Sequence, residues 1–152
     1  MLSRALRRLQ REAENIENDE SLAKQMKILN KDDQDMIWRV SFNGPEHSLY
    51  EGEEFVLQFT FEQNYPIEAP EVVFVGKPPI HEHVYSNGFI CLSILYTGWK
   101  PSMTVASTVL SIVSMLASAE KKKKPKNDKE MIRTTKGERA KDQEWIFEDD
   151  TC

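Results

Sequence analysis

The stretch "EFVLQFTF", residues 54–61, carries the clearest secondary-structure signal in the sequence. Apolar side chains stand at every second position: Phe55, Leu57, Phe59 and Phe61. Successive side chains of a β-strand point to opposite faces of its sheet, so this alternation predicts a half-buried strand with one face toward a core.

The sequence on either side extends this strand into a sheet. Residues 38–42 alternate in the same way before a Gly-Pro turn, and a short apolar run covers residues 72–75. Pro66 and Pro70 separate that run from the strand at 54–61, and strand-like patterning begins near Met26. Four strands that follow one another through turns predict an antiparallel meander.

Helical periodicity brackets the predicted sheet. Apolar residues near the N-terminus alternate steps of four and three: Leu2, Leu6, Leu9, Ala13 and Ile16. They predict an amphipathic N-terminal helix, and a central, well-buried helix is predicted after Thr104, a suitable N-cap. Residues 121–152 are mostly charged, so we expect a loosely packed, mobile C-terminal tail. The expected fold for residues 1–152 is one α+β domain.

Composition excludes several classes of protein. A net charge of -5 over 152 residues argues against a general nucleic-acid binder, and no apolar run is long enough to cross a membrane. The two cysteines, Cys91 and Cys152, are too few for a disulfide framework and are typical of a reducing compartment. We therefore expect a soluble protein of the cytoplasm, the nucleus or both.

Residues 76–104 keep no regular period and predict a long loop that carries the site. Within it, "HEHVYSNGFICLSIL", residues 81–95, places His81, His83 and Cys91 close in sequence. An inert buried thiol is the commonest role of a lone cysteine. A zinc site would lack ligands unless Cys152 joined it, and a cysteine protease needs a histidine oriented by a third group.

Several motifs in this order resemble the ubiquitin-conjugating enzyme (E2) family. They are "RRLQRE", "YEGEEF", "YPIEAP", the His81 to Cys91 segment and "GWKPSMT". Within that family the sequence is similar to the W type, which shares "HVYSNG", "ICLSIL" and an end reading "DDTC". The resemblance implies the E2 core fold, with residues 1–152 as a single ubiquitin-conjugating domain.

The resemblance implies thioester chemistry at Cys91. The thiol would accept the C-terminal glycine of ubiquitin from an activating enzyme (E1) and pass it to a substrate amine. A thiolate suits both steps, because it is a good nucleophile in the first and a good leaving group in the second. No metal or other cofactor is implied, since ATP is consumed by the E1. An E2 for another ubiquitin-like modifier and a non-catalytic E2-like binding module stay open as alternatives.

Two departures from the common E2 pattern bear on mechanism. His81-Glu82-His83 stands where most E2s have His-Pro-Asn, so His83 replaces the asparagine that supports the oxyanion or the active-site loop. An imidazole N–H there would donate to the developing oxyanion, a type of contact worth roughly 3 kcal/mol, or the side chain would only brace the loop. His81 is expected to maintain loop structure.

The second departure is in the stretch from Ala119 to Lys124, where lysine-directed E2s have an acidic residue that helps the incoming lysine. An α-amino group, with a pKa of about 7.7 to 8.0 against about 10.4 for lysine, needs less help. W-type E2s modify protein N-termini, so the resemblance implies transfer to the α-amino group, with a lysine-directed E2 as the alternative. The lysine run by itself is interpreted as a solvated surface.

The resemblance also implies partners: ubiquitin, an E1, RING or U-box ligases (E3s) and proteins with flexible N-termini, but no nucleic acid and no membrane. The implied contact residues are Ile67, Pro101 and Ser102 for ligases, Arg7, Arg8 and Arg11 for the E1 and ligases, and Leu110 and Ser114 for donor ubiquitin. Tyr65 and Trp99 are expected to be packing residues.

Overall fold

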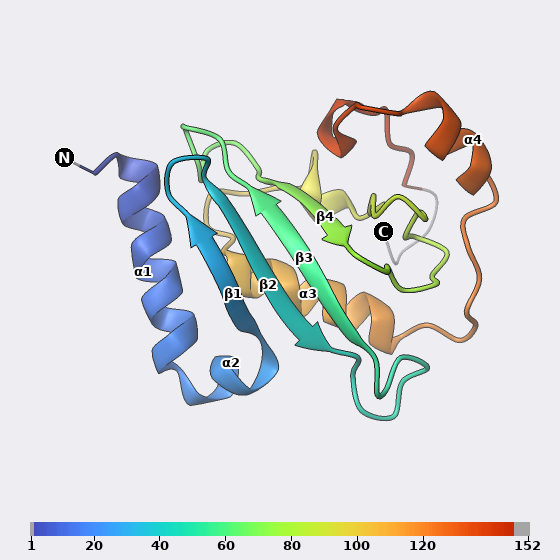
Figure 1. The fold of residues 1–152 in the computed structure, drawn as a ribbon, viewed down its shortest axis with the longest axis horizontal. Coiled ribbons are helices and arrows are strands. Elements are labelled where there is room, and N and C mark those ends of the chain that lie inside the picture. The colour runs from blue at the N-terminus through green and yellow to red at the C-terminus, as the bar shows by residue number, and fades with distance from the viewer. Residues whose placement is uncertain (1, 148–152) are drawn as a thin grey trace.

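Four antiparallel strands form the predicted meander (Figure 1). The computed structural model describes residues 2–147, and the strands follow chain order across the sheet as β1 (Lys27–Asp32), β2 (Ile37–Asn43), β3 (Glu54–Thr60) and β4 (Glu71–Val75). The α+β class and the order of the main elements are therefore confirmed.

The alternating residues of β3 are buried as their pattern predicts. Phe55, Leu57 and Phe59 are at most 3% exposed, and their partners on β2 lie on the same face of the sheet. Trp38 pairs with Phe59 and Val40 with Leu57, so the cross-strand pairs form layers of one apolar core.

Two helices pack around the sheet. In Figure 1, α1 (Arg4–Asn18) flanks the β1 edge and α3 (Val105–Ala117) lies behind the strands. Thr104 caps α3 as predicted, because its side chain accepts from the N–H of Ser107 while the Ser107 hydroxyl accepts from the N–H of Thr104. The short helix α2 (Glu20–Gln25) was not predicted, and it begins at Asp19, whose carboxylate accepts from two backbone N–H groups.

A buried carboxylate joins α1 to α3. Glu12 is 7% exposed, and its Oε1 accepts from the N–H of Val105 at 2.7 Å. Its Oε2 accepts from the Tyr65 hydroxyl at 2.6 Å and from Arg8 Nε at 3.0 Å. Burial and the Glu12 carboxylate both raise the pKa of Tyr65 far above its usual range, which keeps this hydroxyl a donor. The first helix is therefore locked to the domain by polar as well as apolar contacts.

The expectation of a loosely packed tail is wrong for residues 128–147. This segment forms α4 (Asp128–Thr134) and the 3-10 turn η2 (Ala140–Asp142), which lie over the active-site loop in Figure 1. Glu71 on β4 is 8% exposed and accepts from the N–H of Ala140 at 2.8 Å and of Lys141 at 3.0 Å. The apolar residues of this segment have no periodic spacing, so their pattern did not indicate packing.

In residues 2–147 no helix is long and apolar enough to cross a membrane.

Candidate active site

The Asn87-Gly88 turn folds the loop back on itself and sets the position of Cys91. Gly88 has a φ of +93° and lies so close to β4 that a Cβ would stand 2.2 Å from the carbonyl oxygen of Phe74. Only glycine fits this site without displacing backbone. Beyond the turn, Ile90 forms a β-bridge with Val84, which brings Cys91 alongside His83.

Cys91 lies at the junction of the loop and the C-terminal segment. Its N–H donates to the carbonyl of His83 at 2.8 Å, and its Sγ lies 3.8 Å from the carbonyl oxygen of Ile146. The residue is only 9% exposed and packs with Tyr85, Phe89 and Ala140. Cys91 is therefore mostly covered by the loop and the C-terminal segment.

The two histidines are neighbours in the same loop. His81 is 3% exposed, and its Nδ1 accepts from the backbone N–H of His83 at 2.9 Å. The side chain of His83 is also buried, with Nε2 4.0 Å from the Glu82 carboxylate. The backbone of His83 thus connects His81 to Cys91, which gives both residues a part in shaping the loop.

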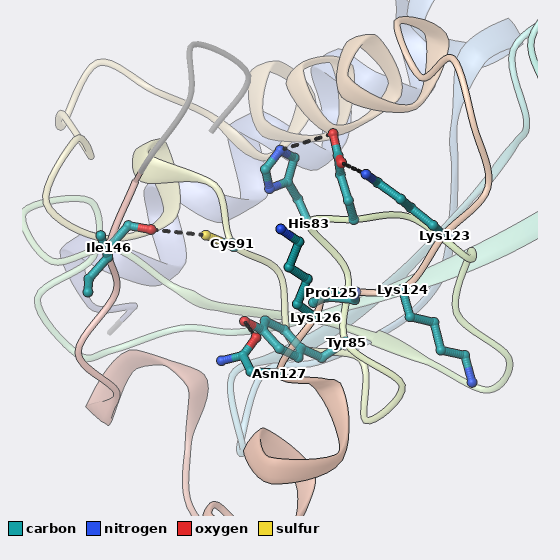
Figure 2. A pocket seen from close by; sticks show the side chains of 10 residues that line it. His83, Tyr85, Cys91, Lys123, Lys124, Pro125, Lys126, Asn127 and Ile146 are labelled. Atoms are coloured by element: carbon teal, nitrogen blue, oxygen red, sulfur yellow. Dashed lines mark hydrogen bonds and ion pairs between the residues drawn. The ribbon is translucent and has the colours of Figure 1, made fainter.

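A pocket of about 380 Å³ opens beside the thiol (Figure 2). His83, Tyr85 and Cys91 of the loop line it together with residues of the segment before α4: Lys123, Lys124, Pro125, Lys126 and Asn127. Among residues 2–147, Glu82 is the one carboxylate that lines the pocket, and Lys123 Nζ lies 3.3 Å from it. The described part of the lining thus has more basic than acidic side chains.

Among residues 2–147 no group of three or more His, Cys, Asp or Glu side chains is arranged to hold a metal ion. Cys152 lies outside the described residues, so the four-ligand zinc arrangement is not represented in this part of the chain.

Residues 8–147 match the family model described as "Ubiquitin-conjugating enzyme". The chain belongs to the ubiquitin-conjugating enzyme family. It is 43% identical to a "Probable ubiquitin-conjugating enzyme E2 W" of Dictyostelium discoideum, with 99% of each chain covered. It is 48% identical to the "Ubiquitin-conjugating enzyme E2 W" of Caenorhabditis elegans, with 74% of each chain covered.

Solved structures agree with this membership. The E2 UbcA1 from Agrocybe aegerita superimposes with a TM-score of 0.82 at 36% identity, covering 88% of this chain and 96% of that one. As a family member, this E2 is a transferase that carries ubiquitin as a cysteine thioester and passes it to an amine. Ubiquitin, an E1 and E3 ligases are the general partners of such enzymes.

The residues expected to meet ligases lie at the surface of this E2. Ile67 is 70% exposed, and Pro101 and Ser102 are exposed on the loop before α3. Arg7 and Arg11 are exposed on α1 and line a shallow basic depression.

Arg8 differs from its two neighbours on α1. Its guanidinium donates to the carbonyl of Met103 at 2.9 Å and of Pro101 at 3.3 Å. It also contacts Glu12 and lies 5.9 Å from the centre of the Tyr65 ring. Arg8 therefore fastens α1 to the loop before α3 through contacts within the domain.

The remaining expected residues are placed as follows. Leu110 and Ser114 lie one turn apart on α3, with Leu110 half-buried and Ser114 exposed. Tyr65 is 2% exposed, and the Trp99 indole N–H donates to the carbonyl of Pro66 at 2.8 Å. The prediction that Tyr65 and Trp99 are packing residues is confirmed.

Three contributors to the site were not indicated by the motifs. Glu71 anchors the C-terminal segment, Trp145 stacks on Tyr96 at 4.9 Å, and Ile146 brings its carbonyl to Cys91. The one signal in the sequence was the apolar triplet of residues 145–147 within an otherwise charged tail.

Proposed function

We propose that Cys91 is the residue that carries ubiquitin and that the charged enzyme transfers it to the α-amino group of a flexible protein N-terminus. In the first step the Cys91 thiolate attacks the thioester carbonyl of E1-bound ubiquitin, and the E1 thiolate leaves. In the second a neutral amine attacks the new thioester, the Cys91 thiolate leaves, and the amine nitrogen releases a proton to solvent.

The basic lining of the pocket supports the choice of amine. Near pH 7.4, pKa values of about 7.8 and 10.4 leave the neutral fraction of an α-amine several hundred times larger than that of lysine. A well-placed carboxylate offsets this difference by orienting and deprotonating lysine. Glu82 faces Lys123 instead, so this pocket gives lysine little such help.

We assign the supporting residues from their positions. His81 holds the loop through the N–H of His83, and His83 either donates to the oxyanion or braces the loop. Ile67, Pro101 and Ser102 form the ligase contact, Arg7 and Arg11 contact the E1 and ligases, and Leu110 with Ser114 supports donor ubiquitin. Arg8 contributes by holding the ligase-facing loop.

The test uses purified E1, ubiquitin and a flexible peptide that has one free α-amine and one lysine. The enzyme should form a thioester that reducing agent removes. Cys91→Ala should abolish it, Cys91→Ser should give at most a stable oxyester, and Cys152→Ala should charge normally. Loss of charging in Cys152→Ala alone would move the nucleophile away from Cys91.

Acceptor choice is read from the same peptide. Acetylation of its N-terminus should nearly abolish transfer, while replacement of its lysine by arginine should change little. Robust transfer to lysine in the acetylated peptide would leave a lysine-directed E2. Charging with another ubiquitin-like modifier but not with ubiquitin would identify a different donor.

A further inference from the structure

The lysine run is exposed to solvent, as predicted, and two of its side chains also form ion pairs with the rest of the domain. Lys122 Nζ lies 2.8 Å from the Glu53 carboxylate and 5.2 Å from the centre of the Tyr50 ring. Lys123 Nζ lies 3.3 Å from the Glu82 carboxylate. These contacts fix the start of the run beside the pocket.

The other end of the run is fixed as well. Asn127 Oδ1 accepts from the Tyr85 hydroxyl at 2.9 Å. Asp128 accepts from the N–H of Ser86 at 2.8 Å and from its hydroxyl at 2.6 Å. The backbone of residues 122–128 therefore runs along the pocket between two anchors, and Lys123, Lys124 and Lys126 line the same pocket as Cys91.

The charge of this pocket is opposite to that of the whole molecule. The chain has a net charge of -5, whereas the lining residues within 2–147 include Lys123, Lys124 and Lys126 and one carboxylate, Glu82. Figure 2 shows the Lys126 side chain extending into the space beside His83, while Lys124 points away from the thiol. Lys126 is therefore the described lysine of the lining that an acceptor approaching this side of the pocket would meet.

We propose that this pocket binds the acceptor polypeptide just beyond its reacting amine and prefers acidic residues there. An extended chain advances about 3.3 to 3.6 Å per residue, so a carboxylate two to four residues after the amine would lie within about 15 Å of Cys91. A volume of about 380 Å³ admits a short stretch of chain rather than a folded surface. The occupant is an acidic, extended peptide segment, with Lys126 as its principal contact.

This inference rests on the proposed function, because it needs a thioester at Cys91. The test therefore separates charging from discharge. Pre-charged enzyme is mixed with three flexible peptides that differ only at positions three and four, which are both Asp, both Asn or both Lys. We expect the Asp peptide to discharge the enzyme about fivefold faster than the Asn peptide at low salt, with the Lys peptide slower still. In 0.5 M salt the three rates should converge, because screening acts on exposed charges.

A matched pair of charge reversals assigns the preference to the pocket. Lys126→Glu should invert the order of the Asp and Lys peptides, while Lys126→Arg should keep it. Lys24→Glu changes the net charge equally but lies on α2, away from the pocket, and should leave the order intact. Equal rates for all three peptides, or a loss of preference in Lys24→Glu as large as in Lys126→Glu, would overturn the inference. Failure to charge would instead count against the proposed function.

Discussion

The body of the domain and its C-terminal segment are held by different kinds of contact. The body has one continuous core, in which Trp38, Leu57 and Phe59 are at most 2% exposed. The C-terminal segment, residues 128–147, has a smaller cluster and depends on Glu71 and on the stacking of Trp145 against Tyr96. Elements with few buried apolar contacts open at lower free-energy cost than core elements.

Cys91 lies where these two regions meet, and this position matters for its chemistry. The thiol is 9% exposed with the C-terminal segment in place, although thioester formation requires an E1-bound ubiquitin to reach it. The large core keeps the loop in position, and we expect the weaker attachment of residues 140–147 to let this segment open without unfolding of the domain. Substitutions in each of the two regions test this difference.

The largest effect is expected from Glu12→Ala, which acts on the body. It leaves the Tyr65 hydroxyl and the Val105 N–H without their acceptor and removes the ion pair with Arg8. We expect the free energy of unfolding to fall by about 3 to 5 kcal/mol, as when one partner of a buried charged network is removed. Urea denaturation measures it.

Glu14→Ala on the same helix is the control, because Glu14 is exposed and its change should stay within about 0.5 kcal/mol. An equal loss of unfolding free energy in Glu12→Ala and Glu14→Ala would show that the contacts of Glu12 do not contribute to stability.

Trp145→Ala acts on the C-terminal segment. It removes the stacking on Tyr96 and the hydrogen bond from the indole to the Ala140 carbonyl. If the substitution lowers the free-energy cost of opening the C-terminal segment by about 1.4 kcal/mol, the fraction of molecules with this segment open rises about tenfold. The rate of alkylation of Cys91 should rise by the same factor. It is measured in a Cys152→Ser background, where Cys91 is the one remaining thiol.

Ile146→Ala is the matched control for that measurement. The Ile146 side chain is 74% exposed, and the variant keeps the backbone carbonyl that faces Cys91. Its alkylation rate should match that of the parent. No acceleration in Trp145→Ala would mean that the segment does not limit access to the thiol.

Ile67→Ala tests the surface of the body without touching its core. Because Ile67 is 70% exposed, stability and charging by the E1 should be unchanged. Ligase-stimulated discharge should fall several-fold, as expected when an exposed apolar anchor is removed from an interface. An unchanged response to every active ligase would remove this loop from the contact.

The smallest effect is expected from Glu71→Gln, which weakens the anchor of the C-terminal segment by about 1 kcal/mol, the scale of one hydrogen bond. Burial raises the pKa of the Glu71 carboxyl, although two backbone N–H groups act to lower it. A raised folded-state pKa contributes stability that is present below the unfolded pKa, about 4.3, and is lost as pH rises through the folded value.

The stability advantage of the parent over Glu71→Gln should therefore shrink as the pH rises from about 4.3 toward 7. Urea denaturation at several pH values measures this difference. An advantage that grows with pH would show that the hydrogen bonds to Ala140 and Lys141 outweigh the cost of burial.

Local sequence patterns were sufficient to predict the sheet, its two main helices and the Thr104 cap. Period-two alternation in β3 and four-three spacing in α1 are properties of neighbouring residues, so they appear in the sequence directly. The motifs around Cys91 were sufficient to indicate the family, because they combine several residue types at set spacings.

Only the tertiary structure decided how distant segments meet. Arg8, expected at a partner contact, also binds the Met103 carbonyl, and Ile146 reaches Cys91 from 55 positions away. The lysines of residues 121–124 continue into a pinned segment that lines the pocket beside the thiol. Contacts of this kind depend on where the backbone brings two segments together, and no local period encodes that meeting. For this protein the sequence determined the scaffold and its chemistry, while long-range contacts determined access to the thiol and the charge around it.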